Sequence, residues 1–89
     1  MTATKEDITR WLKDGQEQGA THVIIVHDPW DHGNFPLFVM PGQNAREVFQ
    51  DKYVKPLGPN EMAYRTDECF DLRMDIEAQR KERRANHWD

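Results

Sequence analysis

The sequence is short of cysteine: its 89 residues contain a single one, Cys69. An internal disulfide or a cysteine-rich zinc site needs at least one further thiol, so both are excluded. A lone cysteine is typical of a reducing compartment, and we expect the protein to be cytoplasmic. Because the neighbouring carboxylate of Glu68 should raise the pKa of the thiol, we expect Cys69 to be a small buried apolar residue and not a nucleophile.

Long apolar stretches are also missing. No segment reaches the roughly 18 to 20 consecutive apolar residues that span a bilayer, and the opening residues MTATKEDITRW lack the pattern of a signal peptide. The chain has no Gly/Ser-rich linker and no internal repeat. We therefore expect one small soluble domain over residues 1–89 that does not interact with membranes.

Catalytic and cofactor-binding motifs are absent from the sequence. It has no G-x-S-x-G turn, no glycine-rich loop that would hold a phosphate and no paired-cysteine spacing. We therefore expect no cofactor, and we favour a protein that is not an enzyme.

Cations are fewer than anions, with 12 Lys and Arg against 16 Asp and Glu and a net charge of −4. An acidic body repels phosphate backbones, which argues against general nucleic-acid binding. The exception is a basic C-terminal end at about 80–89, expected to be helical, where RKERR precedes His87 and Trp88. These cations either complement a helix dipole in solvent or contact a protein partner; nucleic-acid binding through this helix is an alternative function.

Caps, apolar spacing and turn residues predict six elements. Thr4 and Asp7 form a relative of the capping box, Gly19 is a natural C-cap, and Asn44 with Glu47 marks a second helix start. The expected elements are a helix over 4–18, strands over 21–27 and 35–40, a helix over 44–54, a strand between 62 and 70, and a helix over 72–88.

The order α-β-β-α-β-α predicts the α+β class: a small three-stranded sheet with helices packed on it. The first two strands are close enough to pair as an antiparallel hairpin. Pro36 lacks an N–H, so it belongs at the start of its strand or on a free edge. The polar content of the third strand also indicates an edge position.

The first two strands are apolar at successive positions, which is typical of strands that are covered on both faces. Three short helices supply limited cover in so small a chain. A second copy would supply more, so we expect a homodimer; the alternative is that the chain's own helices cover both faces.

The segment HDPWDHGNFP between these strands contains the most chemically varied residues of the chain. Imidazole and carboxylate groups bind zinc, iron or manganese, so His27, Asp28, Asp31 and His32 form a candidate metal site with hydrolysis of a phosphate ester as its reaction. However, the spacing H-D-x-x-D-H matches no metal motif with an attached mechanism. The metal-dependent site is therefore the alternative to a binding function.

The same segment also has the composition of a turn. Aspartate side chains bond to nearby backbone N–H groups, and Gly33 and Asn34 tolerate positive φ. Turn formation leaves Trp30 unexplained, and tryptophan is enriched at binding hot spots. The favoured function is a non-enzymatic interaction protein that docks on a cellular or host protein as a modulator or inhibitor. Its predicted contact residues are Asp28, Trp30, Asp31 and Phe35.

Two stretches carry a resemblance to a known family: DITRWLKDGQEQGATHVIIVHDPWDHGNFPLFV and FDLRMDIEAQRKERRANHW. The chain resembles a family of short bacterial and bacteriophage proteins in which a GATH step leads into a strand, an aspartate–aromatic–aspartate loop and a second strand. The family has no assigned activity, so the resemblance transfers no catalytic or binding residue. It implies a small cytoplasmic accessory protein, encoded by a bacterium or a phage.

Overall fold

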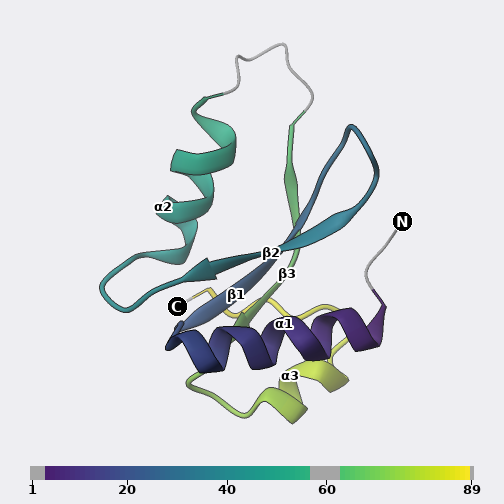
Figure 1. Ribbon diagram of the computed structural model, residues 1–89, viewed down its shortest axis with the longest axis vertical. Coiled ribbons are helices and arrows are strands. Elements are labelled where there is room, and N and C mark those ends of the chain that lie inside the picture. The colour runs from purple at the N-terminus through teal and green to yellow at the C-terminus, as the bar shows by residue number, and fades with distance from the viewer. Residues whose placement is uncertain (1–3, 57–62, 89) are drawn as a thin grey trace.

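A three-stranded antiparallel sheet with helices on both faces forms the body of the protein (Figure 1). The computed structural model describes residues 4–56 and 63–88. The elements are α1 (Lys5–Gln18), β1 (His22–His27), β2 (Asn34–Val39), α2 (Ala45–Phe49), the π-helical turn η1 (Gln50–Val54), β3 (Arg65–Asp71) and α3 (Ile76–Lys81). This order confirms the predicted α+β class. None of the helices within the described ranges is long and apolar enough to cross a membrane.

Strand β1 lies between the other two, in the order β2-β1-β3. It pairs with β2 as the expected hairpin, from His22 opposite Val39 to His27 opposite Asn34. Its pairing with β3 is interrupted by a bulge next to Ile25. Both β2 and β3 are edge strands, which agrees with the predicted positions of Pro36 and of the polar third strand.

Both faces of β1 are covered within one chain. Val23 and Ile25 pack with Leu12 of α1 on one face, and Ile24 and Val26 face a second cluster that α2 and η1 cover. Residues 22–26 are each at most 5% exposed. The chain's own helices therefore cover both faces of the sheet, which was the reason for expecting a second copy. The homodimer stays a prediction.

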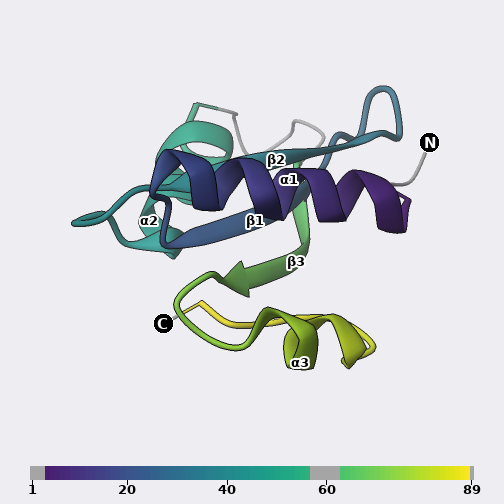
Figure 2. The same ribbon diagram turned by 60° about the horizontal axis from the view of Figure 1, so that its bottom comes forward.

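Helix α1 begins and ends where its caps predict. Thr4 and Asp7 form a reciprocal capping box, and Gly19 ends the helix in the left-handed region at φ 79°. Gly15 faces the sheet, where an added Cβ would lie 2.8 Å from Val23 Cγ2 and 3.0 Å from Leu72 Cδ1. The missing side chain thus allows α1 to lie directly across the sheet (Figure 2).

The prediction of a third helix over 72–88 is wrong in extent, because α3 is helical only from Ile76 to Lys81. Asp75 is the N-cap and accepts hydrogen bonds from two backbone N–H groups of the first turn, which starts the helix later than predicted. Glu82 is extended, and the basic residues 83 and 84 are not helical. The chain then turns back along β3 (Figure 2).

The returning segment and one side chain satisfy the outer edge of β3. The Cys69 N–H donates to the Ala85 carbonyl at 3.0 Å, and the His87 N–H donates to the Cys69 carbonyl at 2.9 Å. The buried amide of Gln79 accepts from the Asp71 N–H at 2.8 Å and donates to the Asp71 carbonyl at 2.7 Å. These bonds satisfy backbone groups that a neighbouring strand would otherwise pair. They explain why α3 ends after six residues.

Substituting Gly15 tests the close approach of α1 to the sheet. We expect Gly15→Ala to lower the free energy of unfolding by about 1 to 3 kcal/mol, because the added methyl overpacks against Val23. This loss opposes the gain of about 1 kcal/mol in helix propensity. Urea denaturation measures the difference, with exposed Gln16→Ala as the control; a more stable Gly15→Ala variant would contradict the close approach.

Substituting Gln79 tests the amide contacts at the β3 edge. We expect Gln79→Leu to lower the free energy of unfolding by about 1 to 3 kcal/mol, because it leaves the buried N–H of Asp71 without a partner. The Asp71 carbonyl keeps the Met74 N–H, at 3.2 Å. Hydrogen exchange at the Asp71 amide should also accelerate. Unfolding and exchange are measured beside Gln16→Leu on the exposed face of α1. Unchanged exchange in Gln79→Leu would show that the amide contributes nothing to the edge.

Candidate interaction site at the hairpin loop

Residues 28–33, the hairpin loop, are held in one shape by four hydrogen bonds. Two are between backbone groups: the Asp28 N–H donates to the Gly33 carbonyl at 2.9 Å, and the His32 N–H donates to the Asp28 carbonyl at 3.0 Å. In the other two, Asp28 Oδ1 accepts from the Trp30 N–H and Asp31 Oδ1 from the Gly33 N–H, both at 2.8 Å. The predicted turn role of both aspartates is confirmed.

The loop places its positive φ at a different residue from those predicted. Among the non-glycine residues in the described ranges, His32 alone has positive φ, at 58°, and neither Gly33 nor Asn34 does. Asn34 begins β2 opposite His27 and must be extended there. Its side-chain amide also donates to Asp67 Oδ2 at 2.8 Å, which ties the loop to β3. Histidine is among the residues that tolerate the left-handed region.

Trp30 projects from the loop and is 50% exposed. Its ring meets Tyr64 edge to face, with the centroids 5.2 Å apart. Tyr64 in turn packs on Tyr53 at 4.7 Å and meets Phe35 at 6.1 Å. Together with Phe49, these rings form the aromatic cluster, which joins the loop, β2, α2 and η1. Trp30 thus stands on a packed base instead of extending freely into solvent.

The four predicted contact residues have different surroundings. Asp28, Trp30 and Asp31 lie together in the hairpin loop. Phe35 is half-buried and packs against the core and Tyr53, so it supports the site from behind. Tyr64 was not predicted as part of the site, because its contact with Trp30 joins segments far apart in the chain.

Within the aromatic cluster, Tyr53 has a shifted pKa. Burial, followed by the nearby Tyr64, raises the pKa of the Tyr53 hydroxyl. Tyr53 therefore remains a neutral phenol near neutral pH. Charge at this site comes from the loop aspartates.

The alternative metal site is not assembled. The rings of His27 and His32 lie 6.1 Å apart between centroids, at an interplanar angle of 45°. Asp28 and Asp31 direct one oxygen each to the loop backbone. Nowhere in residues 4–56 and 63–88 do three or more His, Cys, Asp or Glu side chains converge as metal ligands. His27 ends β1 and the other three residues lie in the hairpin loop, so the four are neighbours in the chain but do not surround a common point.

A buried polar group at the start of β1 combines three catalytic residue types. The Thr21 hydroxyl lies 2.9 Å from His22 Nδ1, and His22 Nε2 lies 3.7 Å from Asp71 Oδ2. The hydrogen bonds from Arg73 are the largest influence on Asp71 and lower the pKa of its carboxyl. His22 is 5% and Asp71 2% exposed, so a substrate does not reach them. We assign this group a structural role.

The thiol of Cys69 is inert. The side chain is fully buried, and burial followed by the nearby Asp71 raises the pKa of the thiol to about 12. Its Sγ contacts the His87 carbonyl at 3.4 Å. The prediction of a small buried apolar residue is confirmed.

The lowered pKa of Asp71 gives a pH dependence with a defined sign. The ionised carboxyl stabilises the folded protein above the unfolded-state pKa of about 3.9, and this stability is lost as the pH falls through the lower folded-state value. We expect Asp71→Asn to be less stable than the wild type at pH 7 and to lose less stability between about pH 5 and 2. Urea denaturation across this range measures both, with exposed Asp51→Asn as the control. If Asp71→Asn loses as much stability as the wild type between about pH 5 and 2, other carboxyls cause the loss.

Comparisons with known proteins add no further functional residue to this site. No protein-family model matches the chain, and neither a curated protein nor a solved structure matches it. The function is therefore argued from the contacts and charges of the site itself.

Proposed function

We propose that the protein is a non-enzymatic interaction protein that docks on a protein partner through Trp30 and the hairpin loop, acting as a modulator or inhibitor. The observation that carries this proposal is a half-exposed tryptophan on a loop fixed by four hydrogen bonds. Of the large apolar side chains exposed in the described residues, Trp30 is the aromatic one, and tryptophan leads the residue types at binding hot spots.

The rigidity of the loop favours binding. A partner that buries the Trp30 ring does not have to order the backbone first, so less conformational entropy is lost on association. Tyr64 packs against the ring, and Trp30 is still half exposed. The partner is expected to offer an apolar pocket for this ring.

The loop aspartates indicate the charge of the partner. Asp28 and Asp31 each use Oδ1 to shape the loop, and the second oxygen of each carboxylate can accept a further bond. A basic rim around the apolar pocket would meet these carboxylates and orient the complex. Phe35 acts in this proposal as support for Tyr64 and not as a contact residue.

The basic C-terminal residues have acidic neighbours. Arg83 and Arg84 line the same surface cavity as Asp67 and Glu68. Carboxylates beside the cations reduce the attraction for a phosphate backbone. This arrangement favours the protein-docking proposal over the nucleic-acid alternative.

The proposal extends to the setting of the protein. A docking protein of this size fits an accessory role in the cytoplasm of a bacterium, including one encoded by a phage. A homodimer would display two loops and strengthen binding to a repeated partner by avidity.

Replacing Trp30 tests the proposed contact. We expect Trp30→Ala to abolish capture of the partner, because the central buried ring is lost, with thermal stability nearly unchanged. Immobilised protein is exposed to lysate, and the retained proteins are quantified by mass spectrometry. Met74→Ala is the matched control, because Met74 is also half exposed but lies outside the loop.

Two outcomes would contradict this proposal. Retention of the same proteins by Trp30→Ala would show that the loop is not the contact. A large fall in its melting temperature would identify Trp30 as a residue of the fold, held for its packing on Tyr64.

A further inference from the structure

Residues 83–88, which we call the strap, cross the outer edge of β3 after the end of α3. Ala85 packs with Phe70 in the core cluster on the α1 face of the sheet. Trp88 packs on the other cluster, which contains Cys69 and lies on the α2 face. The strap therefore covers the edge of the sheet at the place where its two cores meet.

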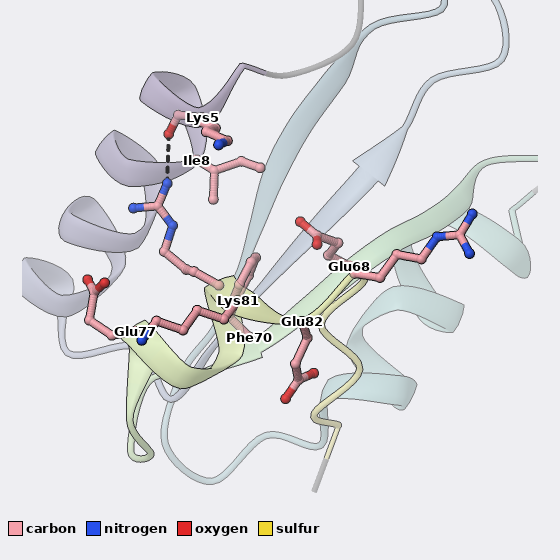
Figure 3. A pocket seen from close by; sticks show the side chains of 9 residues that line it. Lys5, Ile8, Glu68, Phe70, Glu77, Lys81 and Glu82 are labelled. Atoms are coloured by element: carbon pink, nitrogen blue, oxygen red, sulfur yellow. Dashed lines mark hydrogen bonds between the residues drawn. The ribbon is translucent and has the colours of Figure 1, made fainter.

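Hydrogen bonds to β3 hold the backbone of the strap. The Ala85 N–H donates to Glu68 Oε1 at 3.2 Å. The Ala85 carbonyl and the His87 N–H bond to the N–H and the carbonyl of Cys69. Figure 3 shows Glu68 on β3, together with Glu82, the residue that ends α3 and leads into the strap.

Little of the strap is buried. Within residues 83–88, all of which the structure describes, Ala85 alone is buried. Trp88 is half-buried, and Arg46 of α2 lies over its ring, with Cζ 5.1 Å from the ring centroid. An alanine and part of one indole bury little apolar surface, so detaching the strap costs less free energy than unfolding the sheet.

We propose that the strap detaches as one unit while the sheet stays folded, and that this opening uncovers the edge of β3. Gln79 precedes the strap, so its bonds to Asp71 remain and keep that end of β3 covered. The opening frees the N–H and carbonyl of Cys69, two groups with which an extended chain can pair. It also exposes the Cys69 thiol, whose Sγ contacts the His87 carbonyl at 3.4 Å when the strap is closed. The strap does not involve the hairpin loop, and its failure would leave the docking proposal untouched.

The single thiol of the chain reports this opening, because Cys69 is fully buried while the strap is closed. The protein is mixed with excess DTNB, at concentrations where the labelling rate is proportional to the reagent, between 0 and about 2 M urea. We expect the rate to change by less than about twofold per molar urea, since the strap exposes little surface. Labelling through global unfolding would accelerate about fivefold per molar or more.

Variants at the ring contact test what keeps the strap closed. We expect Trp88→Ala to accelerate labelling at least about tenfold, because both the packing of the ring and its cation contact are lost. Arg46→Gln removes the cation alone and should accelerate labelling about threefold. Lys52→Gln, an exposed change of the same charge on η1, should be labelled at the wild-type rate.

Two results would overturn the strap opening. The first is a labelling rate that increases with urea as steeply as the global unfolding constant does, because Cys69 would then react only in unfolded molecules. The second is labelling at the wild-type rate in Arg46→Gln and in folded Trp88→Ala.

Discussion

The burial of β1 on both faces is the constraint from which the rest of the structure follows. A central strand with apolar side chains on each side needs a layer above and a layer below, and this chain has only short helices to provide them. Helix α1 meets the requirement on one face by coming close at Gly15. On the other face, α2 continues into η1, which brings Tyr53 over the sheet. The aromatic base of Trp30 is thus part of the layer that covers β1.

Backbone hydrogen bonding at β3 decides the path of the C-terminal residues. An edge strand has N–H and carbonyl groups that need partners, and the chain supplies them from Gln79 and the segment around Ala85. A longer α3 would have carried that segment away from β3. The early end of α3 therefore allows this segment to pair with β3.

Interactions between neighbouring residues determine most of the helices and strands, and these could be predicted from the sequence. Contacts between distant segments determine the features that could not be predicted. The caps of α1 and α2 and the apolar pattern of β1 depend on neighbouring residues, so the bounds of α1 and β1 and the start of α2 were predicted closely. The helix predicted over 44–54 is α-helical only to Phe49 and continues as the π-helical turn η1. The end of α3 depends on contacts with β3. The residues RKERR favour a helix by their composition, so the early end could not be predicted from them. In the site, the roles of Asp28 and Asp31 are local and were predictable. The support that Tyr64 gives to Trp30 comes through the fold.

The shape of the hairpin loop does not depend on the side chain that it displays to solvent. Its four hydrogen bonds use backbone groups and two aspartate side chains, and none of them uses the side chain at position 30. Natural variation at that position can therefore exchange one displayed group for another while the backbone keeps its course. The group that this loop displays to solvent is therefore set by one residue, while the course of the loop is set by its neighbours.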